Sequence, residues 1–493
     1  EWWERVTDRW GAVLCLGAAV ELPTFGRVVG LMRRRAFGSC VLAVGLLATS
    51  CGDASEEAPE VQQQAEQTTT TTASTTTAAP ATTAAPATTQ APTTTLAQTI
   101  TLVSTTTTAV STTTVGPVAL KWPRDVGISH FGHVSAGWDA GPGGWRRAHP
   151  GVFSWGLIET ESGHYDWQTT DQIVAVMQQD RVAVLTTLWP FAEWDQATCH
   201  SERPRAQPVF PELGDLLYAP CDLVAYSDWL AATVERYDGD GVNDMPGLEY
   251  PMRHWEIANE PEMQGPDFTF FQGDSTAYLE LLRSSYRAIK AADPSAVVLL
   301  GGQAGMFDFM VDYWEPVLEG AHGFFDVGNI HSISSSATFF SGEYRAFLDR
   351  LGHQARPFWV TEAEIGERSL QGGSGQGLAQ TAFTGSVASF VNGAEVVIIA
   401  GAAYGHPRVP QVVRETWEVV VSTIGDFQTV TRLTETSAKF DMPGGTTVYA
   451  LWGGALLPSE VSGSVLTRRY DNVEANLEAS LVESALPTFV LVG

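Results

Sequence analysis

The stretch that most constrains this chain is residues 254–262, HWEIANEPE, a short apolar run that stops abruptly in polar residues. The apolar part predicts a buried strand, and Pro261 cannot continue a ladder of backbone hydrogen bonds. Parallel α/β folds place their chemistry at the carboxyl ends of their strands. Asn259 and Glu260 are therefore predicted to lie at such an end.

A second stretch about a hundred residues later has the same form. Residues 358–364, FWVTEAE, are again an apolar strand that ends in a carboxylate, Glu362. Two carboxyl groups at strand ends of one sheet are what the hydrolysis of a glycosidic bond requires, one as the acid and one as the nucleophile or base.

The sequence WEIANEP followed by FWVTE resembles the retaining glycoside hydrolases of clan A, and the resemblance covers roughly residues 120–493. These enzymes are (β/α)8 barrels. Their acid/base Glu follows an Asn at the end of strand four, and their nucleophile Glu ends strand seven. The resemblance implies that Glu260 is the acid/base, that Glu362 is the nucleophile, and that Asn259 binds the 2-hydroxyl of the sugar. Glu364, two residues on, is the alternative nucleophile.

Predicted strands and helices alternate through most of this region, as a parallel barrel requires. We therefore predict a (β/α)8 TIM barrel over residues 119–428 and a small β-sheet module over residues 429–493. Outside the strand of residues 254–262, the predicted strands are 126–129, 151–155, 181–188, 296–300, 325–330, 357–361 and 395–400, and the predicted helices are 170–179, 223–237, 278–292, 312–318, 343–351, 377–391 and 414–427.

The resemblance also suggests residues that bind the sugar. His331 matches a strand-six histidine of many clan A enzymes, although a lone histidine is more often structural. His130 could line the pocket. Four aromatic residues are candidates for stacking on sugar faces, although aromatic residues of a barrel are as often part of its core: Trp155, Trp189, Trp194 and Tyr404.

The chain departs from the clan pattern at three places. No Tyr follows His331 closely, and the eighth strand ends without the familiar Trp. The Arg that several families supply from strand two is not evident, although Arg146 and Arg147 lie just before the predicted second strand. Glu256, inside the strand-four motif, is predicted to form a structural ion pair within the barrel.

Near the amino terminus, Met32 begins a basic stretch, MRRR, followed by a short apolar run at residues 36–50. This pair is typical of an export signal, and the run is too short to span a membrane. The sequence LATSC resembles a bacterial lipoprotein box, with Cys51 as the lipidated first mature residue. Residues 1–31 are then upstream sequence, which we favour over a structured amino-terminal helix.

Residues 51–118 are rich in Thr, Ala and Pro and hold few large apolar side chains. Such a tract cannot bury enough surface to offset the entropy of ordering, so it is predicted to be a disordered linker. Together with the export signal, it predicts a secreted lipoprotein at the cell surface, attached to the bacterial membrane only through Cys51.

The exported part holds two further cysteines, Cys199 and Cys221. In an oxidising compartment these predict a disulfide that closes a loop, with two free thiols as the alternative. No cluster of metal ligands and no Gly-rich phosphate loop is evident, so we expect no metal and no cofactor.

The net charge of the chain excludes some classes of binding partner. Residues 51–493 hold 22 basic and 52 acidic residues, a formal charge of −30, which repels nucleic acid and suits a neutral carbohydrate substrate. We therefore predict a monomeric O-glycosyl hydrolase acting on β-glycosidic bonds of a polysaccharide or oligosaccharide. Retention requires carboxyl groups about 5–5.5 Å apart, and inversion roughly 6.5–9.5 Å. The alternative is a catalytically inactive glycan-binding barrel protein at the cell surface.

Overall fold

A computed structural model describes residues 129–135, 141–149, 151–265, 268–333, 336–365, 375–400 and 409–493. All of these belong to one compact unit, Ala119–Gly493. The predicted export signal, the lipidation at Cys51, the linker and the sugar-stacking role of Tyr404 concern residues outside the described ranges.

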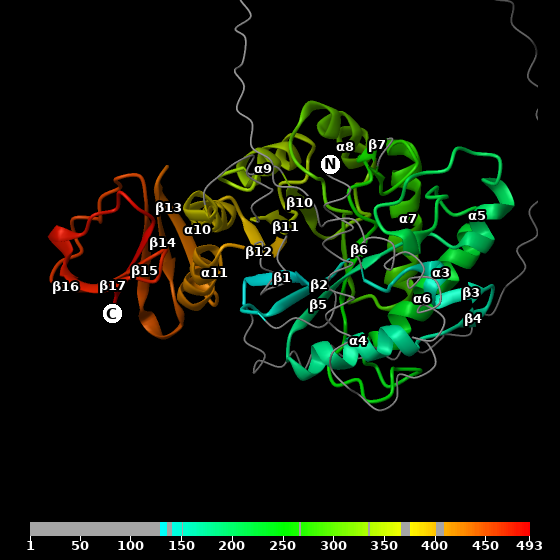
Figure 1. Cartoon of the computed structure of the whole chain (residues 1–493), viewed down its shortest axis with the longest axis horizontal. Coiled ribbons are helices and arrows are strands. Elements are labelled where there is room, and N and C mark those ends of the chain that lie inside the picture. Colours follow the sequence, from blue (N-terminus) through cyan, green and yellow to red (C-terminus); the bar gives the residue numbers. More distant parts are fainter. Residues whose placement is uncertain are drawn as a thin grey trace, which may run out of the picture. The chain divides into compact units, whose positions relative to one another are not determined.

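The centre of the unit is a sheet of eight parallel strands (Figure 1). Two isolated parallel bridges, Leu299 to Val327 and Gln303 to Ile330, join the last strand in the pairing order to the first and so close the ring. This confirms the predicted (β/α)8 barrel. In pairing order the strands are β10 (Gly328–Ser332), β11 (Phe358–Glu364), β12 (Ala394–Ala400), β1 (Phe131–Ser135), β2 (Trp145–Ala148), β5 (Ala183–Leu188), β6 (His254–Ile257) and β9 (Val297–Leu299).

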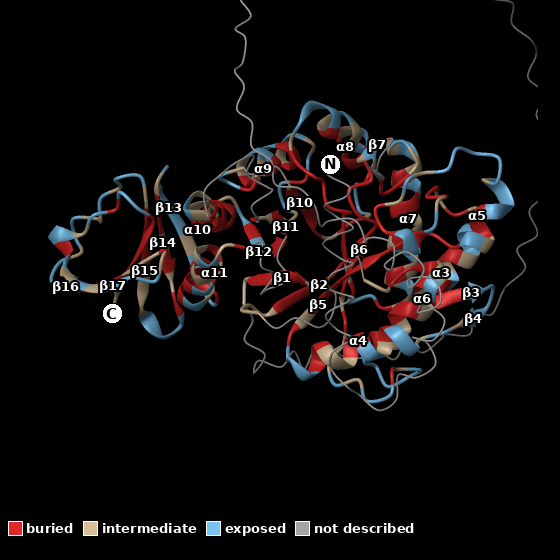
Figure 2. Cartoon of the chain, in the orientation of Figure 1, coloured by how far each residue is buried: buried red, intermediate tan, exposed pale blue. Residues whose placement is uncertain are grey.

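Within the described ranges, seven long helices follow the strands in sequence, each near its predicted position. Most of them bury one face and expose the other, as the colours of α4 in Figure 2 show, whereas α10 has almost no exposed residue. These helices are α4 (Gln168–Gln179), α6 (Leu223–Tyr237), α7 (Ser275–Ala292), α8 (Asp308–Gly320), α9 (Ser341–Arg350), α10 (Gly375–Val391) and α11 (Gln411–Ile424). Shorter elements in the connections are α3 (Trp155–Ile158), β3 (Glu159–Glu161), β4 (His164–Tyr165), α5 (Glu193–Cys199), β7 (Gln264–Gly265) and β8 (Phe268–Thr269). No described helix is both long and apolar enough to cross a lipid bilayer.

The predicted positions of the first two strands were wrong. The first described strand is β1, which begins after the predicted range of 126–129, and the second is β2, which precedes the predicted range of 151–155. The second strand was misplaced because β2 has the sequence WRRA. Two adjacent arginines do not fit the apolar pattern of a buried strand, although all four residues are buried. Arg146 donates to the carbonyl oxygens of Gly141 and Gly143 at 2.9 and 3.2 Å, and Arg147 is enclosed by the barrel.

Side chains inside the barrel form two layers, one apolar and one polar. The apolar layer comes from at least six strands and comprises Val134, Trp145, Leu185, Leu299, Val327, Trp359, Val396, Ile398 and Ala400. The polar layer comes from five strands, and each of its side chains is fully buried: Arg147, Thr187, Glu256, Asn329 and Thr361. In three strands the polar residue follows an apolar one by two positions and so lies nearer the carboxyl end on the same face: Trp145 and Arg147, Leu185 and Thr187, and Trp359 and Thr361.

The predicted carboxyl-terminal module is a six-stranded antiparallel sheet. One of its faces packs on the last barrel helices, since the rings of Phe383 in α10 and Phe489 lie 4.4 Å apart. The other face holds a separate apolar cluster around Leu451 and Val490. In pairing order its strands are β13 (Thr429–Thr434), β14 (Ser437–Asp441), β15 (Thr447–Leu451), β18 (Thr488–Val492), β16 (Ser464–Arg469) and β17 (Glu474–Glu478).

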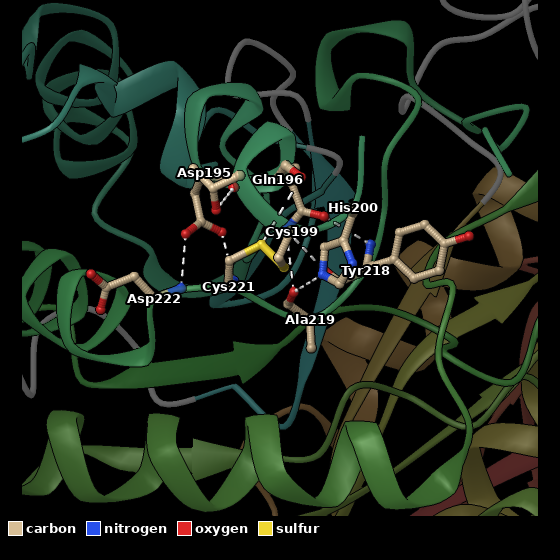
Figure 3. Close-up of a disulfide and its surroundings, with 9 residues drawn as sticks. Asp195, Gln196, Cys199, His200, Tyr218, Ala219, Cys221 and Asp222 are labelled. Carbon is tan, nitrogen blue, oxygen red and sulfur yellow. Dashed lines mark hydrogen bonds between the residues drawn. A yellow bond between two sulfur atoms is a disulfide. The ribbon is translucent and has the colours of Figure 1, made fainter. Parts of the chain in front are cut away.

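The predicted disulfide between Cys199 and Cys221 is present, and it closes the long connection between β5 and α6 (Figure 3). The buried carboxylate of Asp195 fixes the same turn by accepting from the backbone N–H groups of Cys221 and Asp222 at 2.8 and 2.9 Å. The loop after β5 is therefore held both covalently and by charge-assisted hydrogen bonds.

Candidate active site

Glu256 on β6 is the hub of the polar layer. Its Oε2 accepts from the Arg147 Nε at 2.8 Å and from the Thr187 hydroxyl at 2.6 Å, and its Oε1 accepts from Asn329 Nδ2 at 2.5 Å. Burial alone would raise the pKa of Glu256, but the Arg147 charge and the hydrogen bonds lower it instead. The buried carboxylate is therefore ionised, in the ion pair that the sequence predicted.

Arg147 on β2 connects this hub to the strand ends. Besides Glu256, it donates from Nη1 to Glu362 Oε2 at 2.7 Å and from Nη2 to Asn259 Oδ1 at 2.6 Å. Arg147 thus places an arginine on the second barrel strand, and it was missed in the sequence because β2 begins earlier than its pattern indicated. One guanidinium thus orients both the Asn that precedes Glu260 and the predicted nucleophile.

The chain leaves β6 through an unusual turn. Ala258 and Glu260 have positive φ values of 59° and 40°, a region that residues other than Gly rarely adopt. Backbone hydrogen bonds hold the turn in place, from Ala258 N–H to Leu188 at 3.0 Å and from Glu260 N–H to Gly301 at 3.0 Å. Strain of this kind concentrates at functional sites, and here it turns Glu260 into the barrel mouth.

A β-bulge in β11 places Glu362. In the pairing with β10, Ile330 is opposite Val360 but His331 is opposite Glu362, so Thr361 is an extra residue. In a regular strand Thr361 and Glu362 would face opposite sides. Because of the bulge, the Thr361 hydroxyl reaches the polar layer while Glu362 reaches Arg147 at the same end of the barrel.

His331 on β10 lies between these groups, and its hydrogen bonds determine which nitrogen carries a proton. Asn329 donates through its amide nitrogen to Glu256 and to the Leu300 carbonyl, so its Oδ1 is an acceptor. Thr361 gives its only hydroxyl proton to that Oδ1 at 2.6 Å. Thr361 must therefore accept from His331 Nε2, 2.9 Å away, which makes Nε2 a permanent donor.

The other nitrogen of His331 faces the predicted acid/base. His331 Nδ1 lies 2.7 Å from Glu260 Oε1 and 3.7 Å from Glu362 Oε2. Burial lowers the pKa of His331, but the neighbouring carboxyl groups of Glu256 and Glu260, 3.8 and 2.7 Å away, outweigh this effect and raise it to about 9. Burial raises the pKa of Glu260, and the contact with His331 opposes that rise. An acid/base group with a raised pKa is what proton donation near neutral pH requires.

The two predicted catalytic carboxyl groups are close to each other. One oxygen of Glu260, one oxygen of Glu362 and a nitrogen of His331 all lie within 4.8 Å of one another. Such a trio could in principle hold a metal ion, but Arg147 already binds Glu362 and the His331 nitrogen already contacts Glu260. The contacts therefore favour chemistry by the carboxyl groups themselves.

The structure does not bring together all the residues that the sequence proposed. His130 lies at the amino end of β1, where its ring nitrogens are 2.8 and 3.0 Å from the carbonyl oxygens of Glu395 and Phe427. It is thus at the opposite end of the barrel from Glu260. Trp155 is fully buried in α3, and its indole N–H donates to Glu159 at 2.6 Å. Its ring has no exposed face with which to stack on a sugar.

Trp189, which follows β5 directly, does lie at the carboxyl end of the strands. It is fully buried, however, and its ring lies 5.6 Å from His149 and 6.1 Å from Phe270. His149 follows β2 and was not singled out in the sequence. Burial, Arg147 and His331 together lower the pKa of His149 well below its usual value, so this imidazole is neutral.

Glu262 is a third carboxyl group that the sequence did not single out. It is buried, and its Oε1 accepts from the backbone N–H of Ala304 at 2.6 Å, while its Oε2 has no partner among the described residues. Burial, reinforced by the Glu260 charge, raises its pKa to about 8. The only sequence signal for it was its place two residues after Glu260.

Comparison with known proteins gives a likeness of fold. No family model matches the sequence, and no curated protein matches it either. A family 39 glycoside hydrolase from the gut symbiont Bacteroides cellulosilyticus WH2 superimposes with a TM-score of 0.50 at 15% identity, covering 74% of this chain and 81% of that one. A glucosidase from Croceicoccus marinus gives 0.49 at 13% identity, covering 74% and 95%.

The chain therefore shares its barrel fold with a family 39 glycoside hydrolase, in agreement with the (β/α)8 barrel that the sequence predicted. At this identity the likeness concerns the fold alone. What the site does is argued from its own residues.

Proposed function

We propose that this protein is a retaining glycoside hydrolase that cleaves β-glycosidic bonds of an oligosaccharide or polysaccharide. The observation that supports this most strongly is the pair Glu260 and Glu362, with carboxyl oxygens within 4.8 Å at the carboxyl ends of two barrel strands. Inverting enzymes hold their carboxyl groups roughly 6.5–9.5 Å apart to leave room for a water molecule, so the short separation favours a direct attack by one carboxylate.

In the first step, Glu362 attacks the anomeric carbon while Glu260 gives its proton to the departing glycosidic oxygen. The carbon–oxygen bond breaks, and a glycosyl-enzyme ester forms on Glu362. In the second step, Glu260 takes a proton from water, which attacks the anomeric carbon and releases Glu362. The two carboxyl groups thus need different charges in the resting enzyme, one neutral and one ionised.

The surroundings support this division of roles. Arg147 donates to Glu362 at 2.7 Å, which holds this carboxylate in a fixed position for attack. Burial favours the protonated form of Glu260. Asn259 accepts from Arg147 through Oδ1, so its Nδ2 remains as a donor with no partner among the described residues. This N–H is the group we assign to the 2-hydroxyl of the sugar.

We also propose that the enzyme is an exported lipoprotein attached through Cys51. The support is the basic and apolar run before Cys51 and the Thr-rich tract after it. Expression of the full chain in a bacterium with labelled fatty acid, beside a Cys51→Ala variant, tests this: label in the wild type alone supports the anchor, and an unlabelled membrane-free wild type excludes it.

The catalytic proposal is tested by hydrolysis of aryl β-glycosides, β-glucan, mannan and xylan by the wild type, Glu260→Ala and Glu362→Gln. We expect Glu362→Gln to lose turnover of every substrate that the wild type cleaves. Azide should restore activity to Glu260→Ala, because a small nucleophile does not need a general base. A wild type that binds one polysaccharide but cleaves none would instead establish a glycan-binding protein.

A further inference from the structure

The loop after β9 leads from the acid/base residue to an exposed aromatic pair. Near its start, the carbonyl oxygen of Gly301 accepts from Glu260 N–H at 3.0 Å, and further on the Ala304 N–H donates to Glu262 at 2.6 Å. Gly302 passes so close to His331 that a Cβ there would lie 2.0 Å from the ring. The loop then ends in Phe307, directly before α8.

Nearly all aromatic side chains of the described residues are buried or half-buried, and two near this loop are exceptions. Among the large hydrophobic side chains that are exposed in the described ranges, the only aromatic ones are Phe307 and Phe309, which are 47% and 54% exposed. They stand two residues apart, at the end of the loop that begins beside Glu260. Exposed aromatic side chains that gather on one part of a surface can form a binding site.

A third ring joins them from the next connection along the barrel. Phe340, half-buried at the start of α9, lies 6.1 Å from the ring of Phe307 at an angle of 70°. Both rings pack over Gly305, where a Cβ would be 3.3 Å from Phe340 and 3.6 Å from Phe307. The missing side chain at Gly305 lets the two rings approach the loop backbone.

The backbone beneath Phe340 is held in a costly conformation. Phe339 and Phe340 both have positive φ, at 52° and 55°, a region that residues other than Gly rarely adopt. Phe339 is buried against Gly385 of α10, where a Cβ would be 2.7 Å from its ring. Phe339 thus anchors the turn, and Phe340 is left to face Phe307.

We propose that Phe307 and Phe340, extended by Phe309, form a platform that binds the sugar ring on the leaving-group side of the cleaved bond. This rests on the proposed function, in which Glu260 protonates the departing oxygen, so the leaving group lies on the side of Glu260 and its neighbouring loop. A β-linked glucose, mannose or xylose ring presents a flat face of C–H bonds that packs well on aromatic rings. The substrate class is therefore an oligosaccharide or polysaccharide that continues beyond the cleaved bond.

The experiment compares two substrates with the same sugar on the nucleophile side. One is the glycosyl fluoride, whose leaving group has no ring, and the other is the corresponding β-linked oligosaccharide. The measured quantity is the ratio of kcat/KM for the oligosaccharide to kcat/KM for the fluoride. We expect Phe307→Ala and Phe307→Leu to lower this ratio about tenfold, mainly through KM, and Phe307→Trp to keep it.

Leu456→Ala, which truncates an exposed side chain in the carboxyl-terminal sheet module, is the matched control and should leave the ratio at its wild-type value. A ratio within twofold of wild type in both Phe307→Ala and Phe309→Ala would overturn the platform while leaving the proposed function intact. A wild type that cleaves neither substrate would overturn the proposed function, and the platform with it.

Discussion

Removal of Arg147 should both destabilise the barrel and disable the site. The guanidinium is fully buried and compensates two carboxylates, Glu256 at 2.7 Å and Glu362 at 2.7 Å. In Arg147→Met, Glu256 keeps its hydrogen bonds from Thr187 and Asn329 but loses its only cation at hydrogen-bond distance among the described residues. Breaking a buried ion pair from one side costs about 3–5 kcal/mol, because the remaining charge is left uncompensated.

The assay for this is thermal unfolding of four proteins: wild type, Arg147→Met, Glu256→Gln and the double variant. The neutral amide that Glu256→Gln introduces no longer needs the guanidinium. The double variant should therefore be more stable than the sum of the two single losses implies, by about 1 kcal/mol or more. A free energy of unfolding of Arg147→Met that lies within about 1 kcal/mol of the wild-type value would refute this reasoning. Losses of the two single variants that simply add in the double variant would also refute it.

Three further predictions concern protonation and cross-linking. His331→Asn should move the alkaline limb of the kcat/KM profile to higher pH, because His331 opposes the rise in the pKa of Glu260 that burial causes; a limb that stays or moves down contradicts this. The folded pKa of Glu262, about 8, exceeds its ordinary value of 4.5, so stability from its neutral form is full below pH 4.5 and is lost as pH rises through 8. Glu262→Gln should therefore raise the melting temperature at pH 8 and leave it unchanged at pH 4.5, and an equal shift at both pH values refutes the argument. The paired change Cys199→Ser and Cys221→Ser opens a loop of 22 residues and should cost about 3 kcal/mol in unfolding measurements, whereas an unchanged melting temperature would mean that Asp195 alone holds the turn.

The sequence was most informative where an apolar run ended abruptly at a Pro or a carboxylate. The strands β6 and β11 were placed within a few residues, and their terminal carboxylates, Glu260 and Glu362, are the two that the structure brings together. An apolar run that ends at a Pro or a carboxylate has few other interpretations, so both the strand and its end could be predicted.

The other features of the site could not be predicted, because they depend on contacts between strands that are far apart in the sequence. Arg147 contradicts the apolar pattern of a buried strand, and it is tolerated only because Glu256, from a strand 109 residues later, lies opposite. Strict alternation would turn Glu362 away from the barrel interior, and the bulge at Thr361 that reverses this leaves no local sequence signal. The prediction that His130 lines the pocket depended on a first strand that ends near this residue. Because β1 instead begins after His130, this side chain lies at the amino end of the barrel.

The measurement that tests the central claim most directly is mass spectrometry of the protein after incubation with a 2-deoxy-2-fluoro glycoside that bears an activated leaving group. The fluorine slows both steps and the activated leaving group keeps only the first one fast, so a retaining enzyme accumulates its covalent intermediate. The account predicts one added glycosyl group, on the peptide that contains Glu362 and at that residue. A label on Glu364, or hydrolysis of an ordinary aryl glycoside with inversion and no covalent species, would contradict it.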